Sequence, residues 1–406
     1  MSPFILLENT KSHPAGERTL YFVDPTEEII CTDPTLLDAC LDKIDYMRQQ
    51  GFYLVGFVSY EASYFLAPYP VSDYVHQDDF PLLHFYVFRD RQDSISSLSS
   101  PRRRGSIYRT IQHCMSRLFS EWVPAFAGMT KNKKPVSDVK LNITEKEYAD
   151  QFEKIKKHII DGDTYQVNFT VKYDFTMQGD PLELYQLLRE RQKVEYAALF
   201  YFKDYQILSL SPELFFSKQA NKITTKPMKG TMPRSTDSAV DSQNKKVLTT
   251  DPKLIAENIM IVDLLRNDVS KVAIPGSLSV SGLLHVESYE TVHQMVSTIE
   301  CEVAIDTSFK TLIESLFPCG SITGVPKKRT MQIIHDLEKN PRRLYTGAIG
   351  YVTPDNDMCF SVAIRTLLIR DKKGELGVGG GIISDSVMDQ ELEELKLKAR
   401  FFTGLV

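Results

Sequence analysis

The sequence predicts an α+β protein in which antiparallel β-sheets are flanked by helices. Short apolar runs typical of strands occur at residues 196–202, 206–211, 346–352, 359–369 and 375–380. Few helices are predicted between consecutive members of this set, whereas a parallel sheet needs a long crossover between neighbouring strands. The chain has 406 residues, 42% of them hydrophobic, so it can bury a large core and has room for two or three domains.

The first 91 residues are predicted to form an N-terminal α/β part of this structure. Asp33-Pro34 marks the start of a helix and Gly51 marks its end. Two β-rich runs, at residues 52–59 and 81–88, are predicted to be strands. Apolar residues recur at helical spacing before the first run, at Leu37, Leu41, Ile44 and Met47.

Residues 92–137 interrupt this pattern and are predicted to be an inserted, flexible segment. They include a serine-rich stretch at 94–100 and two short basic clusters, at 102–104 and 131–134. The sequence around Trp122, the only tryptophan, resembles translated bacterial repeat elements that insert into genes. The arginines could bind an anionic partner, but a tolerated surface loop is the simpler interpretation. No chemistry is assigned to this segment.

Residues 138–406 carry most of the predicted secondary structure. Thr144 and Glu147 form a capping-box pattern, which predicts a helix that starts there and extends to residue 160. A strand is predicted at residues 165–173. Further helices are predicted at 182–191, 254–266 and 309–316.

Composition excludes several classes of protein. The net charge is −5 and no basic stripe occurs, so we expect no nucleic-acid partner. No apolar run reaches the roughly 18 residues that span a bilayer, so we expect no membrane segment. The first residues lack the basic start of a signal peptide. The six cysteines include no Cys-X-X-Cys pair, which favours reduced thiols and a cytoplasmic location.

One lysine has an unusual setting. Lys229 lies between Pro227 and Gly230, residues that favour a tight loop for reasons of backbone shape. A solvated turn is the commoner explanation for such a short motif. A nucleophilic lysine is the alternative, since it must be positioned and kept partly uncharged.

An acidic cluster precedes the C-terminus. On a helix, Glu391, Glu394 and Lys398 would share one face, because they are separated by three and four residues. A solvated Glu–Lys pair is the ordinary interpretation. Two carboxylates on one face can also hold a magnesium ion that keeps several waters.

Six sequence blocks occur together with these features. Besides the lysine segment they are Tyr165-Gln-Val-Asn168, Ser211-Pro-Glu213, the run 257–268 that begins with Glu-Asn-Ile-Met, the run 318–327 that begins with Pro-Cys-Gly-Ser, and Gly379-Gly-Gly-Ile382. In this order they resemble the signature blocks of the chorismate-utilising enzymes. That family includes anthranilate synthase component I, aminodeoxychorismate synthase component I, isochorismate synthase and salicylate synthase. The resemblance implies an α+β fold with a two-sheet antiparallel β sandwich flanked by helices and an active site in the cleft between the sheets. Residues 138–406 would be the chorismate-binding catalytic domain.

The resemblance also implies a set of site residues. Glu257, Glu391 and Glu394 match magnesium ligands, and Mg²⁺ would neutralise the ring carboxylate of the substrate. Arg365 and Tyr345 match contacts to the enolpyruvyl carboxylate. A lone histidine in an apolar strand, such as His293, is more often a satisfied core residue, and the thiol of Cys319 is interpreted as buried filler rather than a nucleophile. The implied substrate contacts are Gln166, Gly230, Thr231, His293, Thr323, Gly324, Tyr345, Arg365, Gly379, Gly380, Gly381 and Lys398.

Two positions discriminate within the family. Isochorismate and salicylate synthases resemble each other in having a lysine where this chain has Gln166, and glutamine cannot serve as the base that activates water. A lysine at position 229 is the mark of aminodeoxychorismate synthase, whereas anthranilate synthases have alanine there. The implied reaction is amination of chorismate at C4 to give 4-amino-4-deoxychorismate, a precursor of 4-aminobenzoate and folate.

In the implied mechanism Lys229 is the covalent nucleophile and Glu213 the acid. No segment resembles a glutaminase, so a separate glutamine amidotransferase subunit is expected to supply ammonia. Two alternatives stay open. The first is anthranilate synthase component I, and the second is a non-catalytic scaffold that only binds the glutaminase.

Overall fold

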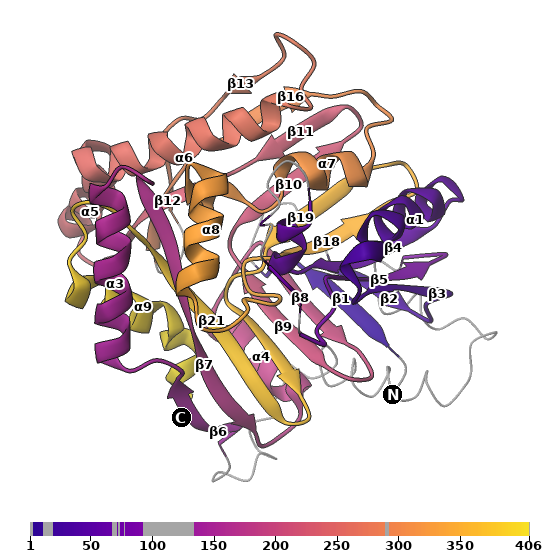
Figure 1. The fold of residues 1–406 in the computed structure, drawn as a ribbon, viewed down its shortest axis with the longest axis horizontal. Helices are drawn as coiled ribbons and strands as arrows, with labels where there is room; N and C mark the ends of the chain where they lie inside the picture. The colour runs from indigo at the N-terminus through magenta and orange to yellow at the C-terminus, as the bar shows by residue number, and fades with distance from the viewer. Residues whose placement is uncertain are drawn as a thin grey trace.

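Two large antiparallel sheets and one small sheet form the framework of the protein (Figure 1). This computed structural model describes residues 3–10, 19–66, 71, 74–76, 78–91, 134–288 and 292–405. The predicted insertion therefore lies outside the described residues up to position 133. Every strand pairing within the described ranges is antiparallel, which confirms the predicted fold class.

The first large sheet contains nine of the described strands. β6 (Val136–Leu141) pairs with β7 at one side of the main strand path. Val136 and Ser137, which the sequence placed at the end of the insertion, therefore belong to the sheet. The path runs β17 (Gly324–Val325), β7 (Gln166–Met177), β21 (Lys373–Ile382), β20 (Thr366–Arg370), β9 (Gln206–Ser211), β8 (Tyr196–Tyr201), β1 (Phe4–Glu8) and β2 (Thr19–Val23).

The second large sheet also has nine strands in the described part of the chain. Its path runs β13 (Ser279–Val280), β16 (Ile299–Glu302), β11 (Lys222–Thr225), β10 (Leu214–Gln219), β19 (Met358–Val362), β18 (Ala348–Val352), β4 (Tyr53–Val58), β5 (Leu83–Phe88) and β3 (Glu27–Cys31). The small sheet, which the sequence did not predict, consists of β12 (Met228–Pro233), β15 (Val292–Val296) and β14 (His285–Ser288). The N-terminal residues contribute strands to both large sheets and so are part of one sandwich.

An aromatic core fills the space between the two large sheets. Ile5, Phe22 and Phe200 from the first sheet form one buried cluster with Val55 and Phe57 from the second. The ring of Phe57 is 0% exposed and stacks on Phe80 at 5.5 Å between centroids. Side chains alternate between the faces of a strand, so residues next to these in sequence point outward to the helices.

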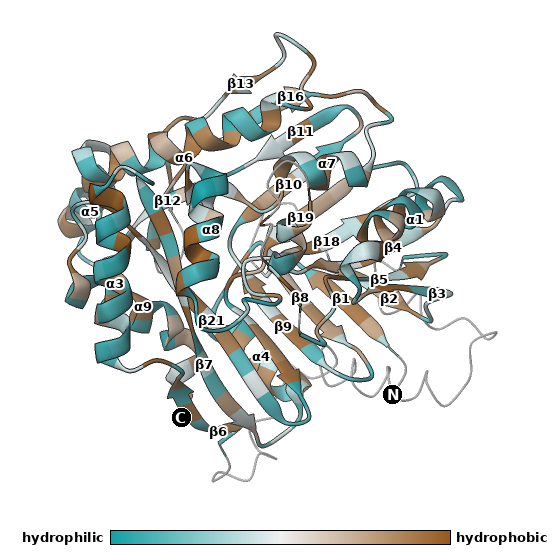
Figure 2. Cartoon of the chain, in the orientation of Figure 1, coloured by the Kyte–Doolittle hydropathy of each residue, from teal (hydrophilic) through white to brown (hydrophobic). Residues whose placement is uncertain are grey.

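Helices cover the outward faces of the sandwich and present their apolar sides to it (Figure 2). α1 (Leu37–Gln49) packs on β3, β4 and β5 with the apolar residues that the sequence predicted. α3 (Glu145–Ile160) begins with the predicted capping box and, with α4 (Pro181–Arg191) and α9 (Met388–Thr403), lies on the first sheet. The other helices in the part of the chain that the structure describes are η1 (Pro34–Leu36), η2 (Tyr60–Tyr64), α5 (Ser238–Thr250), α6 (Pro252–Ser270), α7 (Phe309–Leu316), η6 (Gly320–Ile322) and α8 (Lys327–Leu337).

The prediction of one strand at residues 359–369 was wrong. The chain leaves the second sheet after β19 and enters the first sheet at β20, with Arg365 between them at φ +51°. Both strands are buried on both faces, so their apolar residues form one run in sequence and hide the break.

A second crossover runs beside this one. β9 of the first sheet continues into β10 of the second sheet through residues 212 and 213. The amide of Leu210 donates to the carbonyl of Arg365 at 3.1 Å, and the amide of Val362 donates to the carbonyl of Glu213 at 3.1 Å. The two crossovers therefore bring Glu213 and Arg365 together between the sheets.

None of the helices in the described ranges is both long and apolar enough to span a bilayer.

Candidate active site

Lys229 lies at a bulge in β12, an edge strand of the small sheet. The register against β15 shifts between Met228 and Thr231, so Lys229 and Gly230 stand opposite a single residue. Gly230 has φ +83°, a conformation in which other residues are strained. A bulge of this kind bends a strand and re-aims its side chains. The turn-forming residues that predicted a loop thus produce a bulged strand instead.

The amino group of Lys229 lies beside β21 in a half-buried position. A Cβ placed on Gly381 would stand 3.4 Å from Nζ of Lys229 and 3.1 Å from Nε2 of Gln166. Burial lowers the pKa of Lys229, and this effect outweighs the opposing effect of the Glu257 carboxylate. Among the residues that the structure describes, none forms a hydrogen bond or ion pair with Nζ. The arrangement favours a lysine that is uncharged more often than one in water.

Glu213 lies at the crossover from β9 to β10 and is 6% exposed. Its Oε1 accepts a hydrogen bond of 2.6 Å from the hydroxyl of Ser321. Burial raises the pKa of Glu213, while Ser321 and the charges of Lys229 and Arg365 oppose the shift. A carboxyl group with a raised pKa can stay protonated and donate that proton as an acid.

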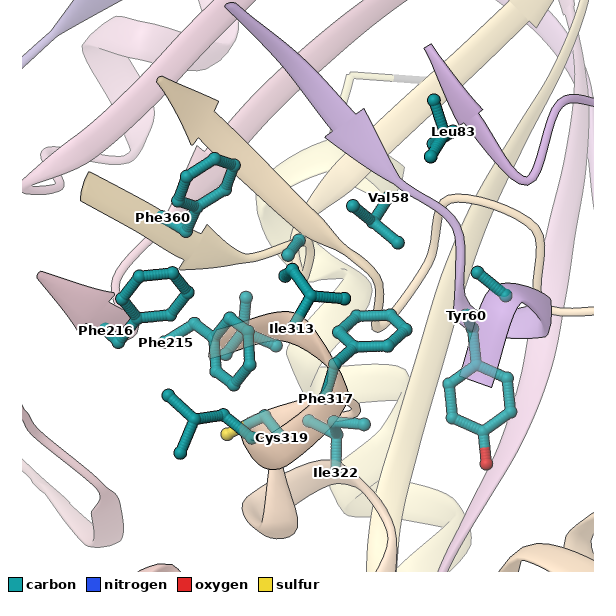
Figure 3. Packing of buried hydrophobic residues seen from close by; sticks show 14 of the residues in the cluster. Val58, Tyr60, Leu83, Phe215, Phe216, Ile313, Phe317, Cys319, Ile322 and Phe360 are labelled. Carbon is teal, nitrogen blue, oxygen red and sulfur yellow. The ribbon is translucent and has the colours of Figure 1, made fainter. Parts of the chain in front are cut away.

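The loop at residues 317–323 is anchored by side chains that pack into the hydrophobic core. Phe317, Cys319 and Ile322 point into the packed cluster beside Phe215 (Figure 3), and the rings of Phe215 and Phe317 lie 6.0 Å apart. Burial raises the pKa of the Cys319 thiol to about 12, which leaves little thiolate near neutral pH. The anchored loop holds Ser321 in hydrogen-bonding contact with Glu213.

The next residues of this loop join β7 and bring Gln166 to the site. A Cβ on Gly324 would stand 1.9 Å from the carbonyl oxygen of Gln166, so this approach requires glycine. The hydroxyl of Thr323 is fully buried and donates to carbonyl oxygens of its own loop, at 3.1 and 3.3 Å. Nε2 of Gln166 is buried and has no hydrogen-bond partner among the described residues. An unpaired buried donor of this kind can bind a ligand.

Arg365 and Tyr345 provide donors near Glu213. Burial lowers the pKa of Arg365 to about 10, against the effect of the Glu213 carboxylate. Within the described ranges, its guanidinium forms no hydrogen bond or ion pair. A Cβ on Gly377 would stand 2.1 Å from Cγ of Tyr345, so this ring lies over β21. Burial also raises the pKa of Tyr345, which keeps the phenol a hydrogen-bond donor.

The glycine triplet lies within a regular strand rather than a turn. Gly379 is opposite Thr170 in the pairing of β21 with β7, and a Cβ there would stand 2.7 Å from the Thr170 side chain. A Cβ on Gly380 would stand 3.4 Å from the nearer carboxylate oxygen of Glu391. Gly381 alone of the three lies beside Lys229, so the triplet serves sheet packing as well as the site.

The carboxylates of Glu391 and Glu394 on α9 affect the pKa of Glu257 on α6. Lys398 forms the predicted ion pair with Glu394 at 2.7 Å and donates to the carbonyl of Gly379 at 2.9 Å. Oε1 of Glu391 accepts a 2.6 Å hydrogen bond from the hydroxyl of Ser386. Burial raises the pKa of Glu257; Lys229 and Lys253 oppose this shift, while Glu394 and Glu391 add to it.

These carboxylates suit a divalent cation in donor chemistry but are not drawn together around one point. Burial acts to raise the pKa of Glu394, and Lys398 reverses this effect, so the net pKa is lowered. Across the described residues, no three His, Cys, Asp or Glu side chains converge as metal ligands. Carboxylates that repel one another, as Glu394 and Glu391 do toward Glu257, are nevertheless the kind of group whose repulsion a magnesium ion relieves.

Two predicted contacts lie in different settings. His293 is 2% exposed, and its ring nitrogens contact the hydroxyl of Ser288 at 2.8 Å and the carboxylate of Asp241 at 3.1 Å. This matches the alternative of a satisfied buried histidine, and its role toward substrate stays a prediction. Thr231 is exposed on β12. The structure therefore brings Lys229, Gln166 and Gly381 into contact and places Glu213, Glu257 and Glu394 where their charges act on Lys229, whereas His293 is held by Ser288 and Asp241.

Ser321 is a site residue that sequence reasoning missed. Its hydroxyl donates to Glu213, which lies 108 positions away in the sequence. No pattern in the sequence around either residue indicates this contact. The available signal was its position between Gly320 and Thr323 in a block already tied to the substrate. A hydroxyl in such a loop is a candidate partner for any buried carboxyl group.

Comparison with known proteins matches nearly the whole chain to one family. Residues 3–404 match the family model described as chorismate binding enzyme. The chain is 40% identical over 278 residues to aminodeoxychorismate synthase of Streptomyces pristinaespiralis, covering 68% of this chain and 39% of that protein. It is 32% identical over 356 residues to aminodeoxychorismate synthase component 1 of Bacillus subtilis (strain 168), covering 85% and 75%.

The fold is also similar to that of solved structures. Anthranilate synthase component I from Streptococcus pneumoniae TIGR4 superposes with a TM-score of 0.75 at 25% identity, covering 96% of this chain and 92% of that one. The matched stretch spans about half the length of several curated relatives, or 39% in the Streptomyces protein. Because the family model covers nearly all of the sequence and the fold agrees over the same length, the chain belongs to the family of chorismate binding enzymes.

Proposed function

We propose that this enzyme aminates chorismate at C4 with ammonia to give 4-amino-4-deoxychorismate. The observation that carries the proposal is the setting of Lys229, a half-buried lysine with a lowered pKa and no ionic partner in the described structure. It lies at a bulge beside Gly381 and Gln166, and the buried carboxyl group of Glu213 acts on its charge. The relatives named aminodeoxychorismate synthase support the same assignment.

The proposed reaction has two substitutions. The neutral amine of Lys229 attacks C2 of chorismate, both ring double bonds shift by one position, and the C4 hydroxyl leaves with the proton of Glu213 as water. Ammonia then attacks C4, both double bonds shift back, and the bond between C2 and the lysine nitrogen breaks. Proton transfer from the new amine to the Glu213 carboxylate leaves the product, a neutral lysine and a protonated Glu213. Covalent catalysis of this kind divides one difficult substitution into two easier ones.

The other residues bind and orient the substrate in this proposal. Arg365 and Tyr345 hold the enolpyruvyl carboxylate, because a guanidinium and a phenol donate to an anion. Gln166 donates its unpaired amide to the ring side of the pocket. Glu257, Glu391 and Glu394 would hold Mg²⁺, which supplies positive charge for the ring carboxylate. Lys398 keeps Glu394 ionised through their ion pair.

Ammonia is proposed to come from a separate glutaminase subunit. Bacillus subtilis and other relatives carry the designation component 1, which implies a second component in those proteins. In its absence, free ammonium should support the reaction, because ammonia alone is the nucleophile of the second step. A cytoplasmic location and a place in folate synthesis belong to the same proposal.

Replacing Arg365 should weaken chorismate binding more than it slows the reaction. We expect Arg365→Lys to raise KM for chorismate by about tenfold to a hundredfold, because hydrogen bonds to a charged group contribute ~1.5–3 kcal/mol and each ~1.4 kcal/mol is tenfold in affinity. Steady-state kinetics with saturating ammonium would measure this. An unchanged KM would remove Arg365 from the substrate-binding set.

Product identification tests the proposed function directly. The chain would be incubated with chorismate, magnesium and an ammonium salt, and an added aminodeoxychorismate lyase would convert the expected product to 4-aminobenzoate for mass spectrometry. Anthranilate as the product would instead assign the chain to anthranilate synthase component I, whose solved relative shares this fold. Unchanged chorismate would favour a non-catalytic scaffold.

A further inference from the structure

Arg342 is a buried arginine that neither the resemblance nor the proposed mechanism uses. It lies between α8 and β18, and its side chain is 2% exposed. Its guanidinium stacks on the ring of Tyr60 with 4.4 Å to the centroid. Figure 3 shows Tyr60 at the edge of the packed cluster that anchors Ile322. A buried cation of this size is kept where its hydrogen bonds determine local geometry.

All five N–H groups of the Arg342 guanidinium are used. Nε and Nη2 donate to the two carboxylate oxygens of Glu338, at 2.8 and 2.6 Å. The second N–H of Nη2 donates to the carbonyl of Asn168 at 2.6 Å. Nη1 donates to the carbonyl of Ile322 at 2.9 Å and to the hydroxyl of Thr346 at 3.3 Å. An arginine has only five such donors, so no capacity remains.

The acceptors belong to three segments that carry predicted substrate contacts. Asn168 is two residues from Gln166 on β7, and Ile322 precedes Thr323 and Gly324. Thr346 follows Tyr345, whose amide donates to the carbonyl of Arg342 at 3.1 Å. Glu338 extends the same network, because its Oε1 accepts from the amide of Thr170 at 3.0 Å. One side chain thus joins three segments that are far apart in sequence.

We propose that Arg342 is a positioning residue that sets the spacing of the Gln166, Thr323 and Tyr345 segments for catalysis. Its guanidinium contacts none of the predicted substrate-binding side chains and acts through the carbonyl oxygens of Asn168 and Ile322 and the hydroxyl of Thr346. This inference rests on the proposed function, since it assumes that those three segments bind the substrate. Small displacements of these segments should slow the reaction, because a misplacement of about 1 Å can reduce a rate by ~10²-fold.

Three variants should distinguish a role of Arg342 in positioning the active-site segments from a role in folding stability alone. Arg342→Lys keeps the charge but has three donors instead of five, and Arg342→Ala removes them all. Lys218→Met is the matched control, because Lys218 is a 0% exposed cation that donates to the carbonyls of Ile305 and Asn356, away from every predicted site residue. All three should lower the melting temperature.

Turnover and chorismate affinity should change only in the arginine variants. We expect kcat/KM to fall by about 10²-fold in Arg342→Ala and by a smaller factor in Arg342→Lys, with no change per folded molecule in Lys218→Met. Arg342 also lines a pocket of about 230 Å³ with Glu61, His335 and Glu338, and truncation to alanine should connect this pocket to the position that the guanidinium vacates. Methylguanidine at millimolar concentration should therefore restore part of the Arg342→Ala activity and none in the control.

Two outcomes would overturn the inference. One is wild-type kcat/KM in the folded fraction of both arginine variants, and the other is a loss in Lys218→Met of the same size. Failure of the proposed function would look different, since the wild-type chain itself would form no 4-amino-4-deoxychorismate. In that case the inference is tested by calorimetric binding of chorismate, where Arg342→Lys should bind at least tenfold more weakly than the wild type, and equal affinity would contradict it.

Discussion

Lys229→Ala should reduce amination of chorismate by on the order of 10³-fold or more, because loss of a covalent nucleophile leaves only binding and electrostatic stabilisation. The structure gives the physical reason for choosing this lysine. Burial lowers its pKa, and the bulge at Gly230 turns it toward Gly381 and Gln166. Ammonium-dependent product formation, followed by mass spectrometry, measures the effect.

The matched control is Lys226→Ala, three positions earlier and outside β12. It should keep wild-type turnover, because Lys226 precedes the bulge and is not placed in the site. Omitting ammonia offers a second readout. The wild-type chain should then accumulate an adduct with the mass of chorismate less one water, and Lys229→Ala should not. An adduct-free wild type, together with an active alanine variant, would assign Lys229 a binding role only.

Local signals in the sequence predicted the elements that depend on neighbours along the chain. The capping box of Thr144 and Glu147 predicted the start of α3, and helical spacing predicted α1 and α7. The small sheet was missed because the prolines and Gly230 around Lys229 have the composition of a turn. Its strand β12 is stabilised by pairing with β15, whose paired residues lie 59 to 68 positions later, and no local pattern records this pairing.

The site depends on contacts of the same non-local kind. The resemblance supplied the residue types, and the charged face of α9 followed from helical spacing. The side-by-side crossovers that bring Glu213 to Arg365 could not be predicted, because the strands flanking Arg365 are buried on both faces and appear as one apolar run. Ser321 and Arg342 were missed for the same reason, since each acts through atoms more than a hundred positions away or on a different strand.

Glu213→Gln should change the shape of the pH profile as well as the rate. The proposed first step needs a neutral Lys229 and a protonated Glu213. The neutral fraction of Lys229 increases as pH rises through its lowered pKa, and the protonated fraction of Glu213 decreases as pH rises through its raised pKa. Their product gives a bell-shaped dependence of kcat/KM in the wild-type enzyme, whichever pKa is the higher.

Glutamine keeps the shape of the side chain and an amide to pair with Ser321, but it has no proton to give to the leaving hydroxyl. We therefore expect Glu213→Gln to lower kcat by about 10²–10⁴-fold, the usual contribution of a general acid. Its residual rate should rise with pH to a plateau, because only the lysine titration remains. The Glu213 carboxylate raises the pKa of Lys229 only when it is ionised, so this rise should lie at lower pH than the titration of Lys229 beside an ionised Glu213. A variant that keeps the alkaline decline would show that another group supplies the proton, with Tyr345 and Lys398 the next residues to replace.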